Sequence, residues 1–179
     1  NSIAFNRFSR AFGVEWVNSR NIAKQMLANG YDIAKSGSNQ FIVWFGLPSG
    51  SGVRLNYLME KRIQESEYFK LRDFNITKNK PAIKLRYTGM LGFNSELGYE
   101  FEYAKNSLGL EENRMHTLTM EMSYSVRNKS WINLTSGLSK IKFNGELGTP
   151  LEYEFLRGFK PGTNAIWEVR IRRKISNYF

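Results

Sequence analysis

The sequence predicts a mainly β protein: an antiparallel meander of about eight strands with two short helices, whose sheet is open, strongly twisted or part of a barrel. Three observations predict this fold. Apolar and polar residues alternate with a period of two along most of the chain. Short turns rich in Gly, Pro, Asn and Ser separate the alternating segments. Aromatic residues make up 15% of the chain, and aromatic side chains favour strands.

The first clear pair of strands is predicted at 41–47 (FIVWFGL) and 53–59 (VRLNYLM). The stretch PSGSG between them suits a five-residue hairpin loop. Between 60 and 78 the apolar positions lose a constant period, so we expect one or two strands with a bend in this part of the chain.

The next two strands are predicted at 82–89 and 96–105, and they carry opposite charges. Lys84 and Arg86 project from one face of the first strand, and Glu96 lies among the polar residues of the second. If the two strands are neighbours, these charges lie on the same side of the sheet. Each opposite-charge pair then contributes roughly 0.2–1 kcal/mol.

Two further strands follow at 117–127 and 131–143, with a turn at 128–130 (NKS) between them. One face of the first collects apolar and aromatic residues: Leu118, Met120, Met122, Tyr124 and Val126. In the second, the alternation changes phase near Gly137, which predicts a β-bulge there.

The first helix is predicted at 19–29. Ile22 and Met26 lie four residues apart, as on one face of a helix, and Asn29 followed by Gly30 supplies a C-terminal stop.

The second helix is predicted at 151–157, after Pro150 and before Gly158. It has barely two turns, so packing must hold it in place. We expect Phe155 and Leu156 to be buried beneath the edge of the sheet.

Composition argues against catalysis. The absence of Cys excludes disulfides, thiolate nucleophiles and sulfur-ligated metals, and His116 is the single histidine. Glu100, Glu102 and Glu121 fit a polar sheet face better than a catalytic pair. We therefore expect a protein that is not an enzyme, with no cofactor, no metal and no small-molecule substrate.

The last strand separates apolar and basic residues most clearly. Its apolar positions are Trp167, Val169, Ile171 and Ile175, and we expect them to face a core or lipid. The alternate positions are strongly basic. The chain carries 26 Lys and Arg against 16 Asp and Glu, a formal charge of +10, which favours acidic partners. The candidate partner-binding residues are therefore the basic strand faces: Arg170, Arg172, Lys174, Lys84 and Arg86.

Two alternatives to protein binding arise from the residues themselves. A basic sheet rich in aromatic residues could bind nucleic acid, but here basic and aromatic residues alternate and so lie on opposite faces, which argues against a stacking platform. A free-standing outer-membrane β-barrel needs alternating, aromatic-rich strands of about 9–11 residues with short turns, and this pattern fits much of the sequence. The irregular period at 60–78 and the two predicted helices argue against a complete barrel, so an open or strongly twisted sheet fits equally well.

The C-terminal stretch LEYEFLRGFKPGTNAIWEVRIRRKISNYF resembles the C-terminal β-rich region of large envelope proteins of Bacteroidota. The residues that match are Tyr153, Glu154, Leu156, Gly158, Phe159, Pro161, Gly162, Asn164 and Trp167. Upstream, the stretches VNSRNIAKQML, FIVWFGL, SEYFKLRDFNI and KPAIKLRY are also similar in order and spacing.

This resemblance implies a place at the bacterial outer membrane or its periplasmic face. One related component with a known role is the plug of the type 9 secretion translocon, which closes the large outer-membrane pore. The resemblance therefore implies a non-enzymatic component of a secretion complex, whose partner is a large outer-membrane β-barrel translocon protein. We expect residues 1–179 to form a single β-rich domain, a piece of a longer chain.

Overall fold

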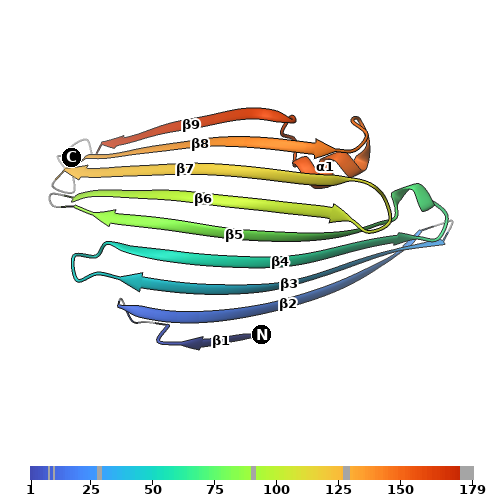
Figure 1. Ribbon diagram of the computed structural model, residues 1–179, viewed down its shortest axis with the longest axis horizontal. Coiled ribbons are helices and arrows are strands. Elements are labelled where there is room, and N and C mark those ends of the chain that lie inside the picture. The colour runs from blue at the N-terminus through green and yellow to red at the C-terminus, as the bar shows by residue number, and fades with distance from the viewer. Residues whose placement is uncertain (8, 10, 28–29, 90–91, 127–129, 174–179) are drawn as a thin grey trace, which may run out of the picture.

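The computed structural model describes residues 1–7, 9, 11–27, 30–89, 92–126 and 130–173. Within these residues, nine strands form one antiparallel sheet in which each strand pairs with the next along the chain (Figure 1). The strands are β1 (Ser2–Phe5), β2 (Phe12–Leu27), β3 (Gly30–Gly46), β4 (Gly52–Ser66), β5 (Phe74–Thr88), β6 (Phe93–Asn106), β7 (Glu112–Val126), β8 (Ser130–Asn144) and β9 (Gly162–Arg173). The predicted mainly β meander is confirmed.

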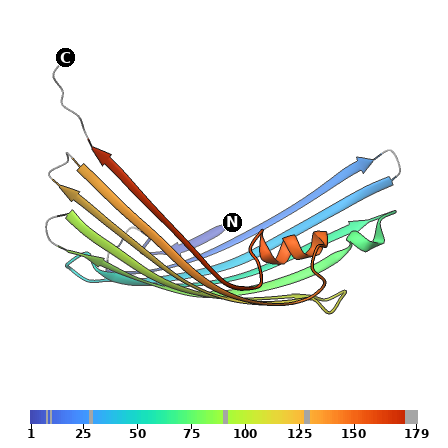
Figure 2. The ribbon, with the colours of Figure 1, turned by 90° about the horizontal axis from the view of Figure 1, so that it is seen from above.

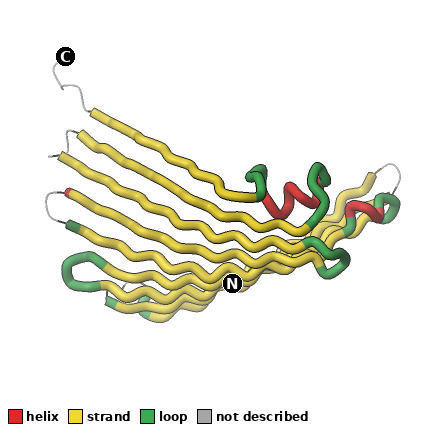
Figure 3. Tube along the Cα trace, turned by 45° about the horizontal axis from the view of Figure 1, so that its top comes forward, coloured by secondary structure: helices red, strands yellow, loops and turns green. Residues whose placement is uncertain are grey.

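The sheet is open and curved. β1 and β9 form its two edges and do not pair with each other. Viewed from above, the sheet bends into a trough, and the helix α1 (Pro150–Leu156) lies inside it (Figure 2). Figure 3 shows the same long strands in yellow, with the green loops gathered at the two ends of the sheet. The side of the sheet that carries α1 is called the concave face, and the opposite side the convex face.

The predicted hairpin between the strands at 41–47 and 53–59 is confirmed, with its loop at 47–51. Gly46 and Gly52 pair at the ends of β3 and β4, and the amide of Gly50 donates to the carbonyl oxygen of Leu47 at 2.9 Å. Gly50 has a φ of 83°, which favours glycine. The predicted bend between 60 and 78 is also confirmed, because β4 ends at Ser66 and the short 3₁₀ helix η1 (Lys70–Arg72) precedes β5.

The predicted pairing of opposite charges is confirmed between β5 and β6. The register places Arg86 opposite Glu96. The Nζ of Lys84 lies 2.8 Å from one carboxylate oxygen of Glu96, and Arg86 lies 3.4 Å from the other.

The helix predicted at 19–29 is wrong. Residues 19–27 continue β2, which pairs with β3 from Phe12 to Leu27; residues 28–29 lie outside the described part of the chain. Ile22 and Met26 are an even number of residues apart, so the same spacing that suggested one helix face also places them on one face of a strand. Gly30, with a φ of 123°, begins β3 and does not end a helix.

The bulge predicted near Gly137 is also wrong. Gly137 pairs with Thr119 on one side and Ile166 on the other, and the register of β8 runs without interruption from Ser130 to Asn144. The apolar residues change parity because Ile141 lies on the concave side, in the core under α1. The turn predicted at 128–130 falls largely outside the described residues.

The second predicted helix is confirmed as α1. Thr149 caps its N-terminus by accepting a hydrogen bond from the amide of Glu152, and Arg157 ends it in a left-handed conformation. Phe155 and Leu156 are 1% and 2% exposed. They pack over the concave face of β5 to β8 and not under an edge of the sheet. With them the core contains Ile76, Ala104 and Ile141, and Phe74, Met115, Phe143, Leu151 and Phe159 pack around it.

Candidate functional site

The two faces of the sheet differ sharply in chemistry. Side chains alternate between faces along each strand, so residues that share the parity of the core residue Ala104 on β6 lie on the concave face. The alternate residues, among them Leu97 and Tyr99, lie on the convex face, where they are 43% and 44% exposed. The apolar core under α1 therefore leaves the convex face uncovered.

The exposed convex residues form a continuous surface across eight strands, which we call the apolar band. Every second residue contributes to it within 12–16 of β2, 41–45 of β3, 53–59 of β4, 83–87 of β5, 93–101 of β6, 118–124 of β7, 132–138 of β8 and 165–171 of β9. Serine interrupts it at Ser95 and Ser136. Leu118, Val169 and Ile171 remain 45%, 47% and 72% exposed.

Aromatic side chains gather at both borders of the band. Those toward the end of the sheet with α1 are Trp16, Phe41, Tyr57, Tyr99 and Phe101, and those toward the opposite end are Phe12, Phe45, Tyr87, Phe93 and Tyr124. The rings of Trp16 and Phe41 stack across β2 and β3 with centroids 6.4 Å apart.

The band crosses the strands obliquely. The first charged convex residue beyond it is Lys140 on β8, Arg114 on β7 and Lys105 on β6. Lys140 lies opposite His116, whereas Arg114 lies opposite Tyr103. Each step from β8 to β6 therefore moves the border further toward the α1 end, as expected where tilted strands cross a level boundary.

The concave face is polar and closely paired. Besides the contacts of Glu96 with Lys84 and Arg86, the Nζ of Lys80 lies 2.9 Å from a carboxylate oxygen of Glu100. A basic column on β5 thus faces an acidic column on β6.

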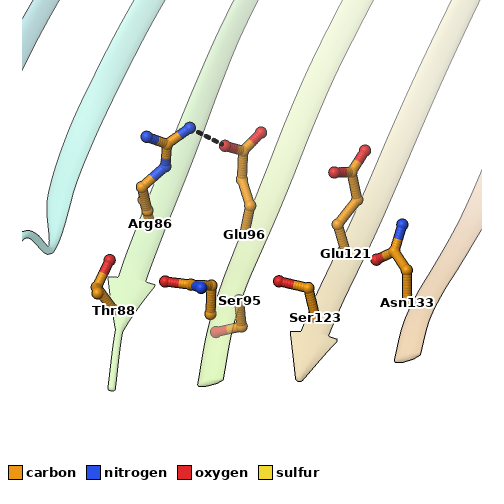
Figure 4. Close-up of a pocket in the computed structure, with 8 residues that line it drawn as sticks. Arg86, Thr88, Ser95, Glu96, Glu121, Ser123 and Asn133 are labelled. Carbon is orange, nitrogen blue, oxygen red and sulfur yellow. Dashed lines mark hydrogen bonds and ion pairs between the residues drawn. The ribbon is translucent and has the colours of Figure 1, made fainter. Parts of the chain in front are cut away.

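A shallow hollow of about 300 Å³ opens on this polar face. Arg86, Glu96, Glu121 and Asn133 project into it from four neighbouring strands (Figure 4). Glu121 lies directly opposite Glu96, so the guanidinium of Arg86 offsets part of the repulsion between two like charges.

Buried charges lie under α1, beyond the apolar band. Lys78 and Glu102 are 1% and 0% exposed. The carboxylate of Glu102 lies 3.4 Å from the Nζ of Lys80 and 3.5 Å from the guanidinium of Arg157. Neither oxygen accepts a well-oriented hydrogen bond from the described residues, so these ion pairs are its compensation. Burial lowers the pKa of Lys78, and the nearby carboxylate of Glu102 opposes that shift.

Polar contacts also hold the backbone of α1 to the sheet. The Nζ of Lys78 donates to the carbonyl oxygen of Glu154 at 3.0 Å. The side-chain nitrogen Nδ2 of buried Asn113 donates to the carbonyl oxygen of Phe155 at 3.4 Å. Arg62 pairs with the carboxylate of Glu154. Helix α1 is therefore fixed by charged and apolar contacts together.

The four predicted partner-binding residues within the described part of the chain lie on the concave face but do not form one patch. Lys84 and Arg86 are on β5, whereas Arg170 and Arg172 are on β9, at the edge of the sheet. Arg170 pairs with Glu168 of its own strand, with nitrogen–oxygen distances of 2.6 and 2.9 Å. Lys174 lies outside the described residues.

Residues of the kinds used in catalysis are dispersed. The described part of the chain contains no group of three or more His, Asp or Glu residues placed to hold a metal ion. The Nδ1 of His116 lies 2.8 Å from the hydroxyl of Tyr99 on the convex face. Glu102 is buried among cations, and Glu100 and Glu121 lie on the polar concave face.

Among the described residues, no helix has the length and apolar character needed to cross a membrane. Comparison of the chain with known protein families, curated proteins and solved structures gives no match.

Proposed function

We propose that this chain forms part of the wall of a membrane-spanning β-barrel, with the convex face against lipid and the concave face toward an aqueous interior. The apolar band carries the proposal. Proteins in water rarely expose a continuous apolar surface that extends across eight strands, and such a surface marks contact with lipid or with a partner.

The dimensions of the band support lipid as the neighbour. On β6 it spans residues 93–101, and the eight steps of ~3.4 Å between these nine residues extend for about 27 Å along the strand. With a strand tilt of about 40°, this corresponds to roughly 21 Å, close to the apolar height of about 25 Å in outer-membrane barrels. Aromatic borders on both sides are a further property of such barrels.

Backbone pairing sets a condition on the proposal. Lipid offers no hydrogen bonds, so every backbone amide and carbonyl within it needs a partner in the protein. The meander pairs β3 to β8 on both sides. β2 pairs with β1 only at 14–17, so the rest of that side of β2 is open, as are the outer edges of β1 and β9. The proposed barrel therefore includes further strands paired to both edges.

The connections suggest an orientation. By the strand bounds, those at the α1 end are 28–29, 67–73, 107–111 and 145–161, and those at the other end are 6–11, 47–51, 89–92 and 127–129, so the two longest connections lie at the α1 end. Outer-membrane barrels have short periplasmic turns and longer extracellular loops. We therefore place the α1 end outside the cell.

We keep the non-enzymatic role and the envelope location implied by the resemblance as part of this proposal. A plug for the type 9 translocon pore, bound to a large barrel partner, is the second candidate function. A plug would cover its apolar faces with its own core and with the partner. The core of this chain lies on the concave side, and this favours the wall over the plug.

Sequential extraction of membranes tests the proposal. The complete barrel that contains this chain is exported in a bacterium with an outer membrane, and the membranes are floated in a density gradient and washed in high salt and then in alkaline carbonate. A barrel wall floats with the membranes and leaves them only in detergent. Release into high salt without detergent would instead support a peripheral plug held by its charges.

A further inference from the structure

The convex face becomes strongly basic just beyond the apolar band at the α1 end. We call this region the cationic collar: Arg20, Lys24, Lys35, Lys61, Lys105, Arg114, Lys140 and Lys142. The acidic residues among the described strand positions of the same region are Glu65 and Glu112, which pair with Lys35 at 3.1 Å and Arg114 at 2.7 Å. The other collar cations make no ion pair with any described residue.

This concentration of charge is specific to one border. At the opposite border, the described convex positions of the strands carry one cation, Arg173. On the concave face, several cations are matched by acidic neighbours, as Lys84 is by Glu96 and Arg170 by Glu168, whereas Arg54 and Arg172 make no ion pair with any described residue. On the described strands, the largest group of cations without ion pairs therefore lies in the collar on the convex face.

Within the collar, β2, β3 and β4 form a site with a defined shape. Arg20 lies opposite Gly37, and Gly37 lies opposite Lys61, so two exposed cations flank a residue without a side chain. They stand two strand spacings apart, about 10 Å at the backbone. A Cβ added to Gly37 would meet its nearest atom only at 3.9 Å, so the space above this glycine is open.

The same three strands place an aromatic row beside these cations. Trp16, Phe41 and Tyr57 lie opposite one another, four residues from Arg20, Gly37 and Lys61 along their strands. Aromatic rings of this kind mark the level of lipid headgroups in membrane proteins. The long side chains of Arg and Lys reach back toward that level.

We infer that Arg20 and Lys61, on either side of Gly37, bind the phosphate of an anionic lipid headgroup. This inference rests on the proposed barrel wall and adds a specific ligand class to it. The lipid tail lies along the apolar band, and the phosphate lies between the guanidinium and the ammonium. Each basic residue at such a surface increases anionic lipid binding roughly fivefold.

Fluorescence quenching of Trp16 tests the site. In the reporter protein, which is the complete barrel, the other three tryptophans of this chain, Trp44, Trp131 and Trp167, and any in the completing strands are replaced by Phe, so that Trp16 is the one remaining indole. The protein is reconstituted into vesicles of phosphatidylcholine and phosphatidylglycerol, with bromine on the chains of one lipid at a time. The quenching ratio gives the relative affinity of the two lipids for the surface at Trp16.

We expect phosphatidylglycerol to be preferred several-fold, and the double substitution Arg20→Gln with Lys61→Gln to reduce this preference at least about fivefold. The matched control, Arg54→Gln with Arg172→Gln, removes two exposed cations from the concave face and should leave the preference unchanged. An unchanged preference in the collar variant, or an equal loss in the control, would overturn the site.

Two further outcomes separate the ligand from the membrane role. Inorganic phosphate, added at constant ionic strength, should leave the preference intact; if it abolished the preference, the site would bind a soluble phosphate and the lipid assignment would be wrong. If neither brominated phosphatidylcholine nor brominated phosphatidylglycerol quenched Trp16, the barrel wall itself would be contradicted, and the lipid site with it.

Discussion

The Nζ of Lys78 on β5 lies 3.0 Å from the carbonyl oxygen of Glu154, so a buried lysine of the sheet donates to the backbone of α1. The contact ties the helix to the interior of the trough at the point where Glu102 is also buried. It places an ionisable group where its protonation must affect stability.

Stability should depend on pH through Lys78. Burial lowers its pKa below the ordinary value of 10.5, so the unfolded chain binds more protons in the window between the lowered pKa and 10.5. Stability from this group therefore rises as pH rises through that window. We measure the free energy of unfolding in urea for detergent-solubilised protein. The free energy of the wild type minus that of Lys78→Met should increase as pH increases. Lys84→Met, at an exposed position of the same strand, is the control. A difference independent of pH would contradict the account.

Removal of the main apolar contact of α1 should be costly. Phe155 is 1% exposed, and its ring centroid lies 5.5 Å from that of Phe143. Phe155→Ala should lower the free energy of unfolding by about 3–5 kcal/mol. Tyr153→Ala on the same helix removes a ring that is 67% exposed and should change it little. Equal effects of the two substitutions would mean that α1 is only a surface connection.

Gly13 should not tolerate a side chain. A Cβ at this position would clash with the ring of Trp44, whose indole nitrogen donates to the carbonyl oxygen of Ser9 at 2.9 Å. Gly13→Ala should therefore displace the indole and cost about 1–3 kcal/mol, seen in chemical unfolding with a change in tryptophan emission. Gly37→Ala, in open space, is the control. Full stability of the Gly13 variant would show that the indole can move freely.

The basic strand face of β9 separates the two proposed functions. Arg170→Glu with Arg172→Glu should leave stability nearly unchanged, since exposed ion pairs contribute roughly 0–1 kcal/mol. If the concave face lines a barrel, the same proteins should co-purify in detergent at low salt with the wild type and with the double variant. Loss of a large barrel partner at low salt would favour the plug and this face as its docking surface.

Alternation predicted most of the sheet because it is a local property. The separation of Lys84 and Arg86 from Leu85 needs no knowledge of neighbouring strands. The helix prediction for residues 19–27 failed because the spacing of Ile22 and Met26 fits the period of a helix and that of a strand. The hydrogen bonds that decide between the two come from β3, another segment of the chain. Likewise, Ile141 changes the apparent phase of β8 only because α1 covers it.

The candidate site was only partly predictable. The last strand indicated one apolar and one basic face, and on the described residues the structure confirms that separation for Trp167 and Arg170. Which face is covered depends on the side on which α1 packs, a tertiary property. The collar joins Arg20 to Lys61 through the registers of three strands, so it becomes visible only when those registers are known.

The most direct test of the barrel wall places the same charge on either face of one strand. Leu97 lies at the middle of the apolar band on β6, and Asn94 lies three residues away on the concave face, at an exposed position. An arginine facing lipid at the bilayer midplane costs about 2–4 kcal/mol, whereas substitutions facing the interior are tolerated. Unfolding in lipid vesicles should therefore show that loss for Leu97→Arg and little change for Asn94→Arg. Equal stability of the two variants would contradict a lipid-facing convex surface.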